Sequence, residues 1–264
     1  MLKLSGVSKT FNPGTVNEKK ALTDVDLRLE RGDFITIVGS NGAGKSTLFN
    51  AIAGAFYVDE GAIRLAGEDI TFKPEYKRSR EIGRLFQDPM RGTAPHMTIE
   101  ENLALAARRG QPRGLGWAIT KQERERYREL LKTLDLGLED RLTSKVGLLS
   151  GGQRQALTLL MATLKKPKLL LLDEHTAALD PKTADKVLDT TERIIQRDKL
   201  TTLMITHNMR DAIAHGNRLI MMYEGRVAID VAGEEKKKLT VEGLLEMFSK
   251  VSGSTEADDK LLLS

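Results

Sequence analysis

An apolar run, a glycine-rich loop and a helix-forming segment follow one another between Phe34 and Ala53. The run from Phe34 to Val38 predicts a buried strand, and the segment from Leu48 to Ala53 predicts the start of a helix. Between them, Gly39 to Thr47 fits the pattern G-x-x-x-x-G-K-[ST]. Glycines let backbone N–H groups turn inward around an anion, and a helix N-terminus adds a favourable dipole. This strand–loop–helix order predicts a phosphate-binding loop in an α/β fold.

Other short motifs follow in order along the chain. Gln87 comes after the segment Ile82 to Phe86, and Leu149-Ser150-Gly151-Gly152-Gln153 lies further on. The all-apolar stretch from Leu169 to Leu172 predicts a buried parallel strand that ends at Asp173-Glu174. His207 follows another strand-like run, Leu203 to Thr206. Each motif alone is weak evidence for a protein family, whereas the order and spacing of all the motifs together are specific evidence.

Over about residues 1 to 230, these motifs resemble those of the nucleotide-binding subunits of ABC ATPases. The resemblance implies a P-loop NTPase fold of the ABC-ATPase type, with a RecA-like core, an antiparallel β subdomain and a helical signature subdomain. In that family's terms, Gln87 is the Q-loop, Leu149 to Gln153 is the signature, and Asp173-Glu174 ends the Walker B strand. Ala177 to Asp180 is the D-loop, and His207 is the switch histidine.

The resemblance also implies a role for each site residue, with ATP and Mg²⁺ as cofactors. Lys45 is expected on the β- and γ-phosphates, Glu174 as the general base, and His207 and Gln87 at the γ-phosphate. Mg²⁺ prefers oxygen ligands, which Ser46, Gln87 and Asp173 supply. Phe11 is expected to stack on adenine, although a core phenylalanine is the alternative. The nucleotide-binding set is completed by the phosphate loop and the signature: Gly39, Ser40, Asn41, Gly42, Ala43, Gly44, Lys45, Ser46, Thr47, Ser150, Gly151, Gly152 and Gln153.

Composition excludes several classes of protein. The chain has no cysteine, so disulfides and zinc–thiolate sites are excluded. A net charge of +4 is too small to indicate nucleic-acid binding, and no apolar run approaches the about 18 residues that span a bilayer. No signal-peptide pattern opens the chain. We therefore expect a cytoplasmic protein, and the resemblance implies that it is peripheral on the inner face of the cell membrane through permease subunits.

The resemblance implies an ATPase domain over 1–230, which leaves a C-terminal extension over 231–264. A helical subdomain is expected at about 88–160, with capping boxes at Thr98 and Thr120 and a Gly/Pro break from Gly110 to Gly116. The first capping box is expected to open a helix through Arg109. Arg218 to Asp230 predicts a hairpin, and Leu244, Leu245 and Phe248 predict a short amphipathic helix before a frayed tail.

One departure from the family pattern follows Glu174. The common form there is Pro-Thr/Ser-Ser-Ala-Leu-Asp, whereas this chain has His175-Thr176-Ala177-Ala178-Leu179-Asp180. The change removes a rigid φ constraint beside the expected base. His175 is open to three interpretations: a pH sensor, a bond across a dimer, or tolerated variation. The Asp-Glu-His-Thr form resembles a bacterial group of importer ATPases encoded beside a lipoprotein-type substrate-binding protein.

The resemblance implies an ATP-hydrolysing subunit that drives a membrane transporter, with a bacterial small-solute importer as the leading hypothesis. Its expected partners are a second copy in a head-to-tail dimer, integral membrane permease subunits and an extracytoplasmic substrate-binding protein. One alternative is an ATPase of a lipid-handling, export or cell-division complex, whose motifs would be the same. Another is a soluble ABC ATPase of repair or translation, although the chain lacks room for long coiled coils and has one nucleotide-binding unit.

Overall fold

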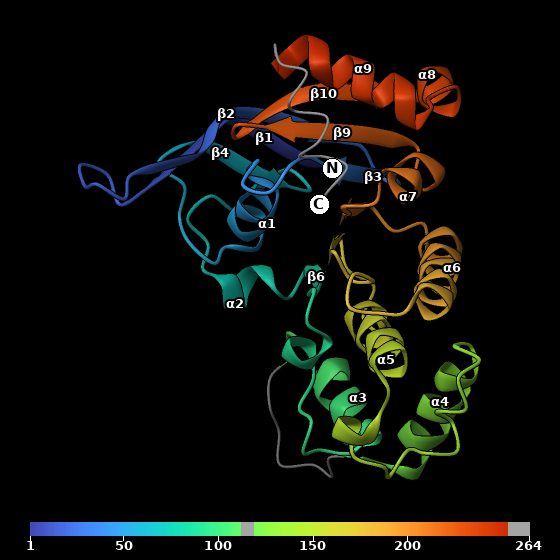
Figure 1. Ribbon diagram of the computed structural model, residues 1–264. Helices are drawn as coiled ribbons and strands as arrows, with labels where there is room; N and C mark the ends of the chain where they lie inside the picture. Colours follow the sequence, from blue (N-terminus) through green and yellow to red (C-terminus); the bar gives the residue numbers. More distant parts are fainter. Residues whose placement is uncertain (112–118, 253–264) are drawn as a thin grey trace. The chain divides into compact units, whose positions relative to one another are not determined.

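The computed structural model describes residues 1–111 and 119–252, and these form two compact units (Figure 1). We call Met1–Arg78 with Leu200–Ser264 the terminal unit, and Ser79–Lys199 the middle unit. Most of the expected Gly/Pro break and the expected frayed tail, apart from Ser252, lie outside the described residues.

An antiparallel sheet in the terminal unit has the strand order β2-β1-β4-β5. Its strands are β1 (Leu2–Phe11), β2 (Lys19–Leu29), β4 (Glu60–Leu65) and β5 (Glu68–Asp69). Val25, Leu27 and Leu29 are buried and alternate with exposed charged residues, as one covered face requires. This alternation is that of a strand with one face packed and the other exposed to solvent.

A second sheet of the terminal unit places β3 (Phe34–Val38) between β8 (Thr202–Ile205) and β9 (Arg218–Tyr223), both parallel to it. All five residues of β3 are buried, and four of them are apolar, as a strand covered on both faces requires. The fifth, Thr36, donates its hydroxyl hydrogen to the carbonyl oxygen of Ala212 at 2.7 Å. β10 (Arg226–Ala232) continues from β9 as the expected hairpin, with positive φ at Glu224 and Gly225 as a two-residue turn requires.

The helices of this unit are α1 (Lys45–Ala53), α2 (Glu75–Arg78), α7 (Met209–Ala214), α8 (Gly233–Lys237) and α9 (Val241–Ser252). α1 begins at Lys45 rather than at the predicted Leu48, because the first turn is formed by polar loop residues. Leu244 and Phe248 of α9 are fully buried, and the Phe248 ring meets Tyr223 of β9 edge-on at 5.3 Å. The predicted C-terminal amphipathic helix is confirmed.

The middle unit pairs β6 (Ile82–Leu85) in parallel with β7 (Leu169–Asp173). Its helices are α3 (Ile99–Ala107), α4 (Lys121–Lys132), α5 (Gly151–Thr163) and α6 (Pro181–Asp198), with short 3₁₀ turns at Pro89–Gly92 and Val146–Leu148. The prediction that α3 runs through Arg109 is wrong by two residues. The chain tightens there into i→i−3 hydrogen bonds and then reaches Gly110 at φ 71°.

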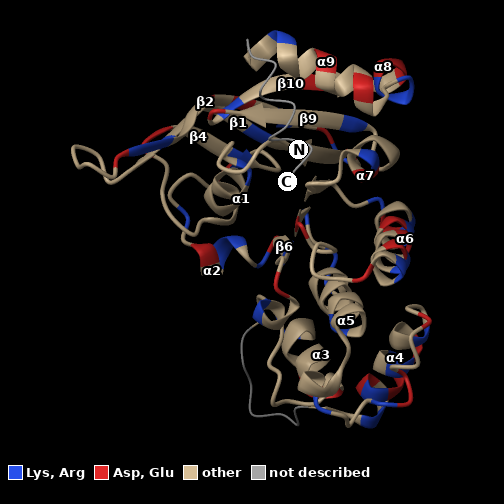
Figure 2. Cartoon of the chain, in the orientation of Figure 1, with Lys and Arg blue, Asp and Glu red and all other residues tan. Residues whose placement is uncertain are grey.

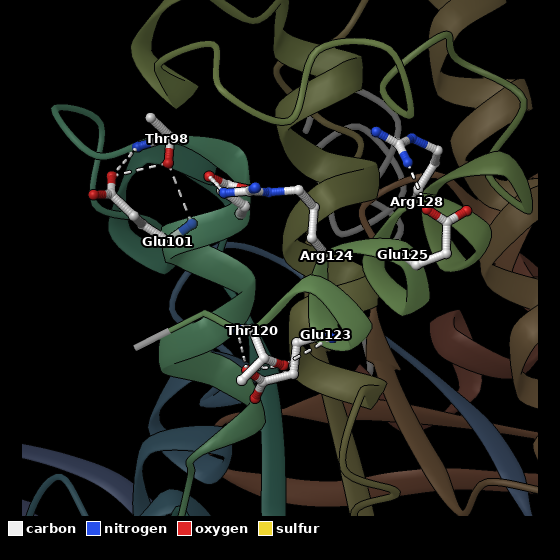
Figure 3. A network of polar contacts seen from close by, with 8 residues as sticks. Thr98, Glu101, Thr120, Glu123, Arg124, Glu125 and Arg128 are labelled. Atoms are coloured by element: carbon white, nitrogen blue, oxygen red, sulfur yellow. Dashed lines mark hydrogen bonds and ion pairs between the residues drawn. The ribbon is translucent and has the colours of Figure 1, made fainter. Parts of the chain in front are cut away.

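Capping boxes fix the starts of α3 and α4, as predicted (Figure 3). The Thr98 hydroxyl accepts from the N–H of Glu101, whose carboxylate accepts from the N–H of Thr98 at 2.7 Å. Thr120 and Glu123 repeat this arrangement. Arg124 of α4 donates two hydrogen bonds, of 2.6 and 3.0 Å, to the carboxylate of Glu100 on α3.

These caps predict a measurable acid sensitivity. Hydrogen bonds from the backbone N–H groups of Thr98 and Thr120 hold the pKa values of Glu101 and Glu123 below their usual range. Their contribution is therefore present above the ordinary glutamate pKa and is lost as pH falls through the lowered folded-state values. We expect the melting temperature of Glu101→Gln/Glu123→Gln to fall less than the parent's between pH 6 and 3. Equal acid sensitivity of the two proteins would contradict this assignment.

Charged side chains are frequent along α4 and α6 (Figure 2). In α6 the buried face is formed by Val187, Leu188, Thr190, Thr191, Ile194 and Ile195.

Within residues 1–111 and 119–252, no helix combines the length and the apolar character that crossing a membrane requires.

Candidate nucleotide-binding and catalytic site

The predicted phosphate loop joins β3 to α1 in the terminal unit, and its shape depends on glycine. Gly39, Gly42 and Gly44 have φ of 148°, 84° and 102°. A Cβ at Gly39 would lie 2.3 Å from the Met222 carbonyl oxygen, and one at Gly44 would lie 2.7 Å from that of Ala21. Both the dihedral angles and the close backbone contacts therefore require glycine here.

Lys45 begins α1 and is buried, at 6% exposure. Its ammonium donates to the carbonyl oxygens of Gly39 at 2.5 Å and Ser40 at 3.2 Å. The side chain thus folds back over the loop that precedes it. Because the first N–H groups of a helix lack intrahelical partners, the loop and the start of α1 can together bind an anion with a fixed cation beside it.

Phe11 and His207 also belong to the terminal unit. Phe11 ends β1, meets Phe56 edge-on at 5.2 Å and lies 5.6 Å from the Lys9 ammonium. The ring therefore has packing partners within the protein, and its stacking on adenine remains a prediction. His207 follows β8 on an exposed turn, next to Asn208, whose side chain caps α7.

Asp173 and Glu174 lie at the end of β7 in the middle unit, and both are half-buried. Glu174 has the left-handed φ of 43°. Its carbonyl oxygen accepts from the N–H of Ala177 at 3.0 Å, which closes a turn toward α6. Asp180 caps α6. A hydrogen bond from the Thr183 side chain lowers the pKa of the Asp180 carboxyl most, and one from the Thr183 backbone lowers it further.

Arg84 is a further candidate site residue, which none of the sequence motifs indicates. On β6, its guanidinium lies 3.3 Å from the Asp173 carboxylate and 4.6 Å from the centre of the Phe86 ring. Arg91 approaches the same ring at 5.1 Å. Gln87, which is exposed, comes directly after Phe86 in the sequence. An arginine within the otherwise apolar run Ile82 to Phe86 was the available signal, because a charge in a buried strand needs a partner.

The signature forms the first turn of α5 in the middle unit. The Ser150 hydroxyl accepts from the N–H of Gln153, whose amide oxygen accepts from the N–H of Ser150, so the motif is itself a capping box. A Cβ at Gly152 would lie 2.2 Å from Thr183 Cγ2. Glycine therefore allows α5 to approach the start of α6.

The predicted residues are thus divided between the units. The terminal unit contains Phe11, the phosphate loop with Lys45 and Ser46, and His207. The middle unit contains Gln87, Asp173, Glu174 and the signature. The roles assigned to these residues remain predictions.

Comparison with known proteins shows the class to which the fold and motifs point. The ABC transporter family model matches residues 22–177, and the chain belongs to this family. The cassette MJ0796, solved as a dimer in a post-hydrolysis state with ADP and Pi, is similar with a TM-score of 0.75 at 30% identity. That match covers 88% of this chain and 98% of MJ0796. The expected ABC-ATPase fold is confirmed.

A tyrosine transport ATP-binding protein of Clostridioides difficile (strain R20291) is 45% identical, covering 94% of this chain and 98% of that protein. The choline transport ATP-binding protein OpuBA of Bacillus subtilis (strain 168) is 36% identical over 86% of this chain. The chain spans 56% of the length of that second relative. The protein is therefore an ATP-hydrolysing, energy-coupling ABC ATPase of a membrane transporter.

Proposed function

We propose that this ATPase drives a bacterial importer of small solutes, and that the solute is an aromatic amino acid or a related compound. The observation that carries the proposal is the match to a protein named for tyrosine transport, which is 45% identical over 94% of this chain and 98% of that protein. The Asp-Glu-His-Thr form after Walker B is the second support. We infer an assembly with permease subunits and an extracytoplasmic substrate-binding protein, on the inner face of the membrane.

The proposed roles follow from the chemistry of each group. Phosphoryl transfer needs positioning and charge stabilisation, which Lys45 and His207 supply at the phosphates. The loop N–H groups hold the phosphates, Thr47 contacts the α-phosphate, and Phe11 stacks on adenine. Glu174 accepts a proton from the attacking water. Two copies pack head to tail, so that Ser150, Gly151 and Gly152 close over the partner's ATP. The dimeric state named for MJ0796 supports this part.

Mg²⁺ fits the donor set of these residues. The Ser46 hydroxyl, the Gln87 amide and the Asp173 carboxylate offer hard oxygen atoms, which suit this ion. Among the residues that the structure describes, no group of three His, Cys, Asp or Glu side chains forms a metal site. We propose that these single side-chain oxygens bind the cation together with the phosphates of the nucleotide. When bound, it neutralises charge that develops during transfer.

A pull-down tests the import assignment. Tagged Glu174→Gln, given Mg-ATP and detergent-solubilised membranes of the source cell, is expected to recover a multi-span permease and a lipid-anchored binding protein. The same variant carrying Lys45→Ala is the control, because loss of nucleotide binding should abolish the ATP-dependent recovery. Recovery of a permease without any binding protein would overturn the inferred binding protein, and recovery of soluble partners alone would overturn the transport assembly.

A further inference from the structure

His175 follows the proposed base directly, yet its side chain is buried. Only 3% of the residue is exposed. Its Nε2 lies 3.2 Å from the hydroxyl oxygen of Thr191, which belongs to the buried face of α6. Both residues belong to the middle unit, so this contact is defined within one compact body.

The direction of this hydrogen bond follows from the other bond that Thr191 makes. A threonine hydroxyl has a single hydrogen, and that of Thr191 donates to the Val187 carbonyl oxygen at 2.7 Å. The Thr191 oxygen must therefore accept from the imidazole, and His175 Nε2 must bear a hydrogen. The contact is then a hydrogen bond from the turn after Glu174 to the third turn of α6, with both partners buried.

The segment that this bond anchors has an unusual backbone. Glu174 adopts φ 43°, a region that residues with a Cβ populate sparsely unless their surroundings hold them there. The N–H of Ala177 donates to the Glu174 carbonyl oxygen, and the N–H of Leu179 donates to that of Thr176, so that the backbone closes a turn. The His175–Thr191 bond connects the residue after Glu174 to α6.

We propose that His175 is a positioning residue for ATP hydrolysis, which acts by fixing the Glu174 carboxylate through its hydrogen bond to Thr191. This inference rests on the proposed role of Glu174 as the general base. It differs from the pH-sensor and cross-dimer interpretations of His175, because the observed bond joins two residues of one chain and needs no change of protonation. Tolerated variation at His175 would instead leave kcat at the parental value. Small displacements of a reacting group reduce turnover strongly while leaving substrate binding intact.

The test compares variants that remove either end of the bond. His175→Leu and Thr191→Val are expected to lower kcat about tenfold while the KM for ATP stays within about twofold. His175→Gln is expected to restore most of the turnover, because its amide nitrogen can donate from nearly the same position. The double variant His175→Leu/Thr191→Val should lower kcat no further than either change alone, because both changes remove the same bond.

Thr163→Val is the matched control. Thr163 is a buried threonine of α5 whose hydroxyl likewise donates four residues back, to Leu159 at 2.8 Å. Its substitution removes the same kind of hydroxyl-to-carbonyl bond within a helix but leaves the His175–Thr191 bond in place. We expect kcat to stay within about twofold of the parent. Equal losses in Thr163→Val and Thr191→Val would overturn the proposal, as would near-parental kcat in His175→Leu or a failure of His175→Gln to recover.

Measurements in the Glu174→Gln background distinguish a failure of the positioning role of His175 from a failure of the general-base role of Glu174. If His175 acts through Glu174, adding Thr191→Val to Glu174→Gln should leave the residual rate unchanged within about twofold. A further tenfold loss would overturn the positioning role. Near-normal turnover of Glu174→Gln itself would reject Glu174 as the base, whereas an inactive Glu174→Gln with a fully active Thr191→Val would reject the anchor alone.

Discussion

Replacing Glu174 with glutamine is expected to reduce steady-state ATP turnover by about a hundredfold or more, because general-base catalysis typically contributes 10²–10⁴-fold. Glutamine keeps the size of the side chain but cannot take a proton from water. ATP binding should survive, because the phosphate loop and Lys45 are unchanged. Phosphate release measures the first effect, and equilibrium binding of a fluorescent ATP analogue measures the second.

The matched control for this experiment is Glu125→Gln, on an exposed face of α4 where the glutamate pairs with Arg128. Its turnover should equal the parent's. Size-exclusion chromatography with Mg-ATP should show Glu174→Gln as a stable dimer, because hydrolysis no longer reopens it. Near-normal hydrolysis by Glu174→Gln would remove this residue from the mechanism.

Replacing Arg78 with methionine is expected to give a large loss of stability. Arg78 is 2% exposed, and its guanidinium donates to the carbonyl oxygens of Ala51, Ile52, Thr71 and Lys73 at 2.7–2.9 Å. Burial lowers the pKa of this guanidinium, since desolvation disfavours its charge. Methionine fills much of the volume but leaves these carbonyl groups without donors. We expect a loss of about 3 kcal/mol in the free energy of unfolding.

For a chain of this size that loss corresponds to a fall in melting temperature of roughly 6–12 °C, which calorimetry can measure. Arg64→Met is the control in the same unit. Arg64 is an exposed residue of β4 whose guanidinium lies 3.9 Å from the Asp69 carboxylate, and exposed pairs contribute little. A melting temperature for Arg78→Met within about 2 °C of the parent would contradict the assignment.

The local elements of this fold were predictable because their signals are local. The apolar run of β3, the capping boxes at Thr98 and Thr120, and the turn at Glu224-Gly225 each place cause and effect within a few residues. Helix ends were less accurate, as at α1 and α3, because frayed first and last turns depend on weak hydrogen bonds.

The contacts that refine the site could not be predicted in the same way. Arg84 meets Asp173 only after β6 has paired with β7, which lies far from it in the sequence. His175 meets Thr191 only after the turn that follows β7 has packed on α6. The burial of Arg78 could not be predicted either, because in the sequence it is an ordinary basic residue within a polar segment. Only the fold shows that its partners include the last carbonyl groups of α1, the helix that begins at Lys45.

The turn of the β9–β10 hairpin restricts how this protein can be engineered. The N–H of Gly225 donates to Ala43 in the phosphate loop, and its carbonyl oxygen accepts from Thr23 on β2. A Cβ at Gly225 would lie 2.8 Å from the Ala21 carbonyl oxygen. A peptide tag inserted at this turn would therefore distort the phosphate loop. The exposed connection at residues 12–18 offers a permissive position for the same tag.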